Sequence, residues 1–273
     1  MEKILGSLVK SALYAPAARR ALGLLASVLA GLALAAGLLA ALQPPAPARA
    51  GPLGAPAAVS YPGPAPCATT LQACIEGVPL HSTILISAGD YFTSVTLDRA
   101  VSLVGAGMFT TTLHALPSQR VMSVTAPVTA GTAISDLGLE GGNAGAASGG
   151  GLYLAPGAQP TLARLFINQN SAANGGGLYA NSSISLSAVT LGGNTATHGF
   201  GGGLDGLGDV SAVDCLFLYN TVITSGSGGG ANAQGNFTGL NLQFGHNAVT
   251  DGYNAGGLNV VGEIGRASCR ERV

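Results

Sequence analysis

Charged side chains are scarce in this 273-residue chain. They make up 8% of it, whereas an average soluble domain carries about 25%. Tryptophan is absent, and the two lysines, Lys3 and Lys10, both stand at the extreme N-terminus. Between residues 51 and 262, three arginines stand against nine carboxylates, a net charge of −6. Because nucleic-acid binding depends on Lys and Arg at the phosphates, we expect no nucleic-acid partner.

Residues that favour long helices are also few, since 43 of the positions are glycine. Each glycine inside a helix costs about 1 kcal/mol relative to alanine. Glycine instead suits tight turns, where a positive φ recurs. The composition therefore favours an all-β fold of many short strands.

The N-terminus has the order of an export signal. A basic region precedes the uncharged run 21–42, and the segment ends in the A-x-A form of a signal-peptidase site; the residues concerned are Lys3, Lys10, Arg19, Arg20 and Ala48 to Ala50. We predict a signal peptide over 1–50, with an uncleaved membrane anchor as the alternative, because about 20 apolar residues span a bilayer. Both place the rest of the chain outside the cytoplasm. The Pro-, Ala- and Gly-rich segment 51–66 is interpreted as a linker.

The last eleven residues, 263–273, differ in composition from the rest, with three arginines and two glutamates. They resemble the translation of a sequencing adapter. We therefore interpret 263–273 as an artefactual tail and 67–262 as a truncated domain, with a genuine basic tail as the alternative.

A glycine motif recurs at a nearly fixed spacing. The residues that follow the glycines are 26, 26, 27 and 27 positions apart, at Leu152, Leu178, Leu204, Ala231 and Leu258. Such self-similarity predicts a repeat architecture. The central glycines of the motif, expected to serve as turns, are Gly150, Gly176, Gly202 and Gly229.

Each repeat also carries an asparagine, namely Asn170, Asn194, Asn220 and Asn247. Apolar residues precede it by three and by five positions, and this period of two indicates a strand with one buried face. A degenerate copy upstream has Gly142 in place of the asparagine. Stacking such repeats at about 4.8 Å gives parallel sheets around an apolar interior. We expect the asparagines to adopt the left-handed conformation and to form a hydrogen-bonded ladder.

The first half of the chain contains less regular β-rich runs and one helical pattern. Leu71 and Ile75 lie four apart behind Thr70, a candidate N-cap, which predicts a short amphipathic helix over the open end of the first coil. Cys67 and Cys74, seven apart in an exported chain, are candidates for a disulfide.

Four segments of the first half carry a family resemblance: Cys67 to Glu76, Thr83 to Tyr91, Val101 to Gly107 and Thr111 to Ala115. They resemble the opening of the bacterial right-handed parallel β-helix proteins of the pectate-lyase-like fold. The Gly-Gly-Leu and Phe-x-x-Asn elements are similar to polymorphic outer-membrane protein repeats. The resemblance implies a right-handed β-helix in a secreted or cell-surface protein of adhesive or structural role, whose C-terminal anchor is missing here.

An enzyme of this fold, a polysaccharide lyase or glycoside hydrolase, is the alternative. The densest acidic group is Asp205, Asp209 and Asp214. Asp214 is expected in an outward column with no carboxylate above or below it, whereas hydrolysis needs two that face each other. Asp205 and Asp209 flank glycines and are interpreted as turn residues. A lyase also needs a base and calcium ligands. Because residues 51–262 contain three arginines and no lysine, such a base is hard to supply. We therefore assign no catalytic residues.

No cofactor or metal is expected either. The four histidines, His81, His114, His198 and His246, lack metal-ligand spacing and are interpreted as surface residues. Cys215 falls in a buried column and is interpreted as a packed apolar residue. The predicted partners are glycans or surface proteins, and a membrane is met only through the N-terminal segment or the missing anchor.

Overall fold

The computed structural model describes residues 57–125, 128, 131–224, 226–251 and 255–272, with side chains as far as residue 265. The predicted signal peptide or anchor over 1–50 and the first part of the predicted linker lie outside these residues. Among the described residues, no helix is both long enough and apolar enough to cross a membrane.

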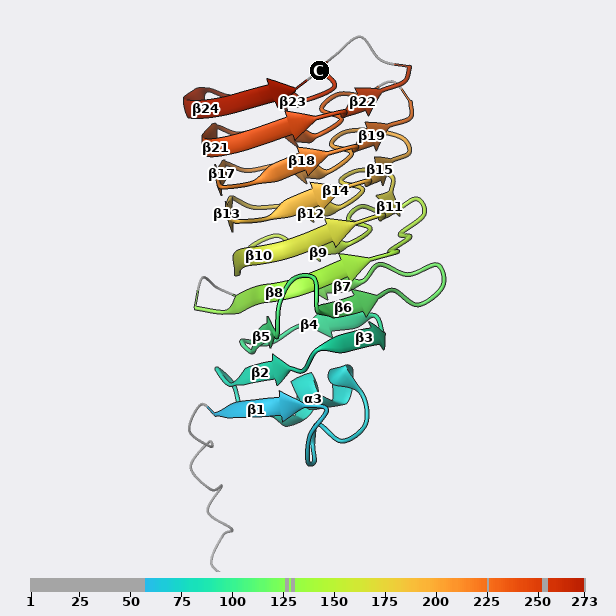
Figure 1. Cartoon of the computed structure of the whole chain (residues 1–273), viewed down its shortest axis with the longest axis vertical. Helices are drawn as coiled ribbons and strands as arrows, with labels where there is room; N and C mark the ends of the chain where they lie inside the picture. Colours follow the sequence, from blue (N-terminus) through green and yellow to red (C-terminus); the bar gives the residue numbers. More distant parts are fainter. Residues whose placement is uncertain (1–56, 126–127, 129–130, 225, 252–254, 273) are drawn as a thin grey trace, which may run out of the picture. The chain divides into compact units, whose positions relative to one another are not determined.

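The described chain is a parallel β-solenoid of about eight turns with one short helix (Figure 1). In the later coils, from residue 161 on, each turn runs through a long sheet A, a short sheet C and then sheet B before it returns to sheet A on the next coil. The earlier described coils pass from sheet A to sheet B without a strand of sheet C. Every strand pairing between coils is parallel, as the stacked repeats predict.

Sheet A forms one long side of the solenoid. Its strands are β1 (Ala58–Tyr61), β2 (Thr83–Ile86), β3 (Gly89–Phe92), β5 (Ser102–Gly105), β6 (Thr111–His114), β8 (Ala133–Glu140), β10 (Thr161–Asn168), β13 (Ile184–Ser187), β14 (Thr190–Gly192), β17 (Val210–Val213), β18 (Leu216–Leu218), β21 (Phe237–Gly245) and β24 (Ile264–Arg272).

Two further sheets complete the coils. Sheet B contains β4 (Val95–Leu97), β7 (Met122–Val124), β9 (Leu152–Leu154), β12 (Leu178–Ala180), β16 (Leu204–Gly206), β20 (Ala231–Ala233) and β23 (Leu258–Val260). Sheet C contains β11 (Ser171–Ala172), β15 (Thr195–Ala196), β19 (Thr221–Val222) and β22 (Ala248–Val249).

The strand register confirms the repeat read from the sequence. Leu178 pairs with Leu152 and with Leu204, and the same column continues through Ala231 to Leu258. In sheet A, the residues three before each asparagine are paired in turn, from Leu139 through Ile167, Leu191 and Phe217 to Phe244. The degenerate upstream copy is thus a true coil.

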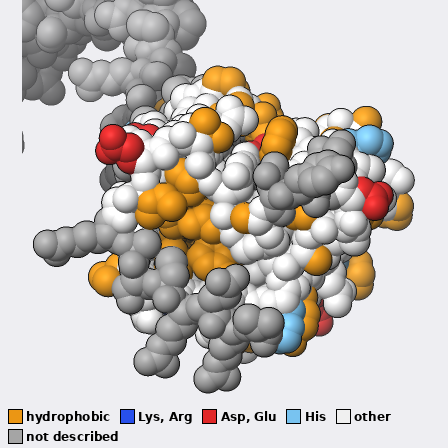
Figure 2. Space-filling model, turned by 90° about the horizontal axis from the view of Figure 1, so that it is seen from above, with side chains coloured by type: hydrophobic (Ala, Val, Ile, Leu, Met, Phe, Trp, Pro, Cys, Tyr) orange, Lys and Arg blue, Asp and Glu red, His pale blue; other side chains and the backbone are white. Residues whose placement is uncertain are grey.

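The interior of the solenoid is apolar. The predicted inward columns are buried, and they include Leu165, Val189, Cys215, Leu242, Ile167, Leu191, Phe217 and Phe244. Phe217 and Phe244 stack with ring centroids 4.6 Å apart. Viewed from the β23 end, hydrophobic side chains gather near the centre of the molecule (Figure 2). Burial of this core is the main stabilising contribution to the fold.

The helix α3 (Leu71–Gly77) confirms the predicted cap. The Thr70 side chain accepts a hydrogen bond from the Ala73 amide, as an N-cap does. The helix packs beside β4, the last strand of sheet B at this end. The Gln72 side chain donates to the Thr96 carbonyl at 3.2 Å and accepts from the Thr96 amide at 2.8 Å. Gln72 therefore pairs with β4 as a neighbouring strand would.

The structure differs from the sequence interpretation at the start of the predicted domain. Ala58–Tyr61, assigned to the linker 51–66, forms β1 and pairs with β2, so the solenoid begins before residue 67. The Pro- and Ala-rich flanks obscured a strand whose Tyr61 is buried. At the other end, Ile264–Arg272 is paired with β21 as β24, with register shifts. Backbone pairing does not test whether 263–273 is translated adapter sequence, so that interpretation stays a prediction.

The expected left-handed conformation was assigned to the wrong residue. In the described coils, the residue before each asparagine has the positive φ, at Gln169, Gly193, Tyr219 and His246. A second left-handed corner lies within β8, β10 and β21, at Asp136, Arg164 and Asn241. In the other two coils it separates β13 from β14 and β17 from β18, at Ala188 and Asp214. The asparagines themselves direct their side chains into the solenoid, where a hydrogen bond is required rather than a special backbone angle.

Candidate functional site

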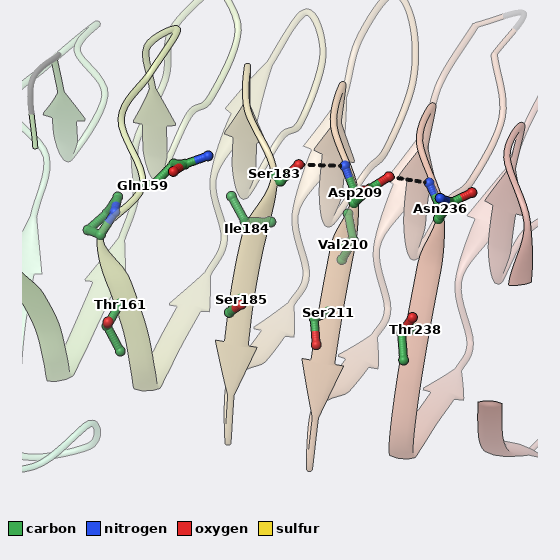
Figure 3. A pocket seen from close by; sticks show the side chains of 11 residues that line it. Gln159, Thr161, Ser183, Ile184, Ser185, Asp209, Val210, Ser211, Asn236 and Thr238 are labelled. Atoms are coloured by element: carbon green, nitrogen blue, oxygen red, sulfur yellow. Dashed lines mark hydrogen bonds between the residues drawn. The ribbon is translucent and has the colours of Figure 1, made fainter. Parts of the chain in front are cut away.

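A groove of about 510 Å³ crosses the outer face of sheet A. It lies where four successive strands, β10, β13, β17 and β21, begin, so it runs across the coils (Figure 3). Its lining residues are Gln159, Pro160, Thr161, Ser183, Ile184, Ser185, Asp209, Val210, Ser211, Asn236 and Thr238.

Hydroxyl side chains form a column along the groove. Ser185 pairs with Ser211, and Ser211 pairs with Thr238, while Thr161 occupies the same position on β10. Their neighbours Ile184 and Val210 are buried. Because alternate residues of a strand point to opposite faces, this pattern places the hydroxyls outside and the apolar residues inside.

A second polar column precedes each strand and links the coils. The Ser183 hydroxyl accepts from the Asp209 amide at 3.1 Å, and Asp209 Oδ1 accepts from the Asn236 amide at 2.8 Å (Figure 3). Asn236 Oδ1 then accepts from the Glu263 amide at 2.9 Å. These bonds hold three polar side chains at a fixed spacing along the groove wall.

The groove is polar but carries little charge. Among its lining residues, Asp209 is the one carboxylate, and none is lysine, arginine or histidine. Hydroxyl and amide groups both donate and accept hydrogen bonds. The arrangement therefore suits a neutral, hydroxyl-rich ligand and lacks the facing pair of carboxylates that glycoside hydrolysis needs.

The three aspartates of the dense acidic group lie apart, and each has its own hydrogen-bond partner. Asp209 lines the groove, whereas Asp214 lies at a left-handed corner and accepts from Asn241 Nδ2 at 2.6 Å. Asp205 lies in β16 and accepts from Asn232 Nδ2 at 2.7 Å. None of these bonds joins one aspartate to another.

Asp205 belongs to a side-chain column on the outer face of sheet B. The column begins with the Arg120 guanidinium 4.7 Å from the Tyr153 ring centroid. Tyr153 stacks on Tyr179 with centroids 5.7 Å apart and planes 2° apart. Asp205, Asn232 and Asn259 continue the column, the last two joined at 2.6 Å. Since their neighbours cover the tyrosine faces, these rings offer no open stacking surface.

Burial gives Asp205 unusual electrostatics. Its side chain is buried, and desolvation raises the pKa of the carboxyl although the hydrogen bond from Asn232 lowers it. Desolvation raises the pKa of Tyr179 as well, and the nearby Asp205 charge adds to this. Shifted groups of this kind mark candidate sites, but no second titrating carboxyl faces Asp205 in the described column.

The predicted turn and ladder residues have structural contacts. Asn170, Asn194 and Asn220 are buried and bond to one another in sequence, and the ladder ends at Asn247. At its other end, the Gly142 amide donates to Asn170 Oδ1 at 2.7 Å. A Cβ atom on Gly150 would lie 2.5 Å from the carbonyl oxygens of Gly176 and Ser171. Neighbouring backbone atoms also leave no room for a Cβ atom at Gly176, Gly202 and Gly229.

The cysteines and histidines lie apart from the groove. Cys67 and Cys74 form a disulfide, as proposed from the sequence, and Cys215 is a buried free thiol. His114 Nε2 lies 3.0 Å from Asp90 Oδ1, His198 contacts Thr197, and His246 stacks on Tyr219. His81 occupies a left-handed position. Among the described residues, no cluster of histidine, cysteine and carboxylate side chains has metal-site geometry.

Sequence reasoning missed the groove, although the signal was present. The column Thr161, Ser185, Ser211 and Thr238 stands nine positions before the four asparagines, and Ser183, Asp209 and Asn236 stand eleven before them. Extending the repeat alignment upstream would have found both columns. It would not have shown that they line a depression, which depends on the turns between sheets B and A.

Comparisons with known proteins give two distant structural similarities and no match in sequence. No protein-family model matches the chain, and no curated protein matches it in sequence. The solenoid is similar to a mutant pectin methylesterase crystallised with hexasaccharide IV, with a TM-score of 0.45, 11% identity, and coverage of 72% of this chain and 80% of that one. It is also similar to a pectin methylesterase crystallised with hexasaccharide VII, with a TM-score of 0.36, 10% identity, and coverage of 79% and 92%. Neither similarity bears on what this chain binds.

Proposed function

We propose that this chain is an exported, non-enzymatic binding protein that holds a neutral polysaccharide in the groove on sheet A. The observation that carries the proposal is the two polar columns, one of four and one of three residues on successive coils, that line one depression. A polysaccharide is itself a repeating chain of hydroxyl groups, so a wall with a regular repeat can make the same contact several times. Each added contact raises the affinity without a deep pocket.

The lining favours a sugar chain over a peptide. Peptides gain affinity from buried aromatic or arginine anchors, and none of the groove residues is aromatic or basic. A peptide strand would pair with an open sheet edge, whereas the groove lies on a sheet face. The Asp209 carboxylate and the net charge of −6 between residues 51 and 262 both disfavour an acidic polysaccharide.

A lyase or glycoside hydrolase of the pectate-lyase-like fold remains the alternative function. The groove holds Asp209 as its one carboxylate, and the other two aspartates of the dense group are bonded elsewhere. General acid–base catalysis of hydrolysis needs two facing carboxyl groups. This arrangement supports binding without turnover.

Export and surface location complete the proposal. They rest on the signal-like segment 1–50 and on the Gly-Gly-Leu and Phe-x-x-Asn elements, which resemble polymorphic outer-membrane protein repeats. Right-handed winding is implied by the resemblance of the opening segments to β-helix proteins of the pectate-lyase-like fold. The disulfide between Cys67 and Cys74 is consistent with an oxidising compartment. An adhesive role in the cell envelope would use the groove, whereas a purely structural stalk would not.

Two leucine substitutions on one strand test the groove. Ser185 and Ser187 are both exposed serines of β13, but only Ser185 lines the groove. The chain is screened on an array of neutral and acidic polysaccharides, and the best ligand is then titrated by calorimetry. We expect Ser185→Leu to weaken binding about tenfold, or 1.4 kcal/mol, and Ser187→Leu to leave it unchanged.

Two outcomes would contradict the proposal. Equal losses of affinity in the two variants would show that binding does not use the groove. If no neutral polysaccharide on the array is bound, the purely structural stalk becomes the favoured function. Release of reducing ends or of unsaturated sugars from a bound polysaccharide would favour the enzymatic alternative.

A further inference from the structure

The strand β3 (Gly89–Phe92) has an open edge. Within the described residues it pairs with β6 alone, because the first coil supplies β1, which pairs with β2, and α3, which lies beside β4. The amides of Gly89 and Thr93 donate to β6 and its preceding residue. The backbone groups of Asp90 and Phe92 alternate with them and so point away from β6.

An aromatic side chain stands on this edge. Phe92 is 76% exposed and stacks on His114 of the next coil, with centroids 5.0 Å apart and planes 22° apart. His114 covers one face of the Phe92 ring, and the other face is directed toward the open edge. The exposed ring is therefore accessible to a partner that pairs with this edge.

The edge strand also carries a carboxylate, Asp90. The Asp90 side chain is 69% exposed and contacts His114 at 3.0 Å, and Glu140 lies 4.0 Å from the other His114 nitrogen. The arginines between residues 57 and 262 are engaged elsewhere: Arg99 with the Glu76 carbonyl, Arg120 with Tyr153 and Arg164 with Asp136. In this part of the chain, no arginine neutralises Asp90.

We propose that the edge of β3 binds an extended basic peptide of a partner protein, which adds as a further strand. The backbone of the peptide would pair with Asp90 and Phe92, as in other strand additions. An arginine or lysine of the peptide would meet the Asp90 carboxylate and the open face of Phe92, which attracts cations. The site is separate from the groove and does not depend on the polysaccharide proposal.

Three labelled peptides probe the edge by fluorescence anisotropy. The first alternates arginine with valine, the second replaces arginine by glutamate, and the third keeps arginine but carries N-methylated amides that cannot pair. We expect the first to bind, and the other two to bind at least tenfold more weakly. Equal binding of the glutamate peptide or of the N-methylated peptide would overturn the proposal.

Matched variants locate the binding. Phe92→Ser is compared with Tyr219→Ser, which removes another exposed aromatic residue, and Asp90→Asn with Asp98→Asn, which removes another exposed carboxylate. We expect Phe92→Ser and Asp90→Asn to weaken binding of the arginine peptide severalfold, and the two controls to leave it unchanged. Equal losses of affinity in a variant and its control would overturn the proposal. It would also be overturned if the wild type self-associates and Phe92→Ser abolishes this, because the edge would then bind a second copy of the chain.

Discussion

The side-chain amide of Asn194 donates to the side-chain oxygen of Asn220 on the next coil, with 2.9 Å between Nδ2 and Oδ1. The same oxygen accepts from the Asn194 backbone amide at 3.1 Å, and Asn194 Nδ2 also donates to the Ile167 carbonyl at 2.9 Å. Both asparagines are fully buried. One amide thus joins three successive coils and leaves none of its hydrogen-bonding groups unpaired.

Replacement of Asn194 by alanine should destabilise the solenoid strongly. It removes the partner of the Asn170 amide, of the Asn170 side chain and of the Ile167 carbonyl, all inside the fold. Each buried group left unpaired costs about 1–3 kcal/mol. We expect Asn194→Ala to lower the free energy of unfolding by about 3 kcal/mol or more in a urea titration.

Asn181→Ala is the control for this substitution. The Asn181 side chain is half-buried and makes one bond of 3.3 Å to the Tyr153 hydroxyl. Its loss should cost less than about 1 kcal/mol. Similar losses in the two variants would show that the ladder adds nothing beyond an ordinary surface bond.

Gly176→Ala should also disrupt the fold, for a steric reason. A Cβ atom at Gly176 would clash with the Thr195 backbone and with the Gly202 carbonyl oxygen. Gly192 is the matched control, because a Cβ atom there would meet nothing closer than 3.3 Å. We expect Gly176→Ala to lower the melting temperature by several degrees or to prevent folding, while Gly192→Ala melts like the wild type in thermal circular dichroism.

The repeat made the core predictable. Periodic positions such as Ile167 and Leu191 must face inward in every coil, so one alignment assigned the buried columns and their register together. The cap helix was predictable for a similar reason, since Thr70 and the spacing of Leu71 and Ile75 are local signals.

Features that depend on turn geometry were not predictable. The left-handed residue is the one before each asparagine, because the asparagine side chain must turn inward to reach its partners. The polar wall of Ser183 and Asp209 depends on how the chain returns from sheet B to sheet A. Asp205, interpreted as a turn residue beside glycine, proved to be an outward strand residue that its neighbours bury.

Loss of the Gln72 side chain should expose the edge of sheet B. Gln72 makes both hydrogen bonds that a neighbouring strand would make to Thr96. We expect Gln72→Ala to lower the free energy of unfolding by about 1 kcal/mol and to speed aggregation, because an open strand edge templates pairing. Light scattering during incubation measures the second effect, with Gln234→Ala, at an exposed glutamine, as control. Equal aggregation rates in the two variants would refute the capping role.

Asp205 should make the protein less stable as pH rises. Burial raises the pKa of this carboxyl in the folded state, so the folded chain holds a proton that the unfolded chain releases. Stability is then greatest below the unfolded pKa of about 3.9 and falls as pH rises through the folded pKa.

Asp205→Asn should remove this loss. The amide keeps an oxygen for the Asn232 donor and continues the column of Asn232 and Asn259 without a buried charge. We expect the variant to be more stable than the wild type at neutral pH by about 1 kcal/mol or more, with the difference shrinking toward pH 4. Urea titrations across this range measure it, and Asp209→Asn, on the exposed side of the same coil, controls for the removal of one negative charge. A constant difference across the range, or a less stable variant at neutral pH, would mean that burial does not disfavour the Asp205 carboxylate.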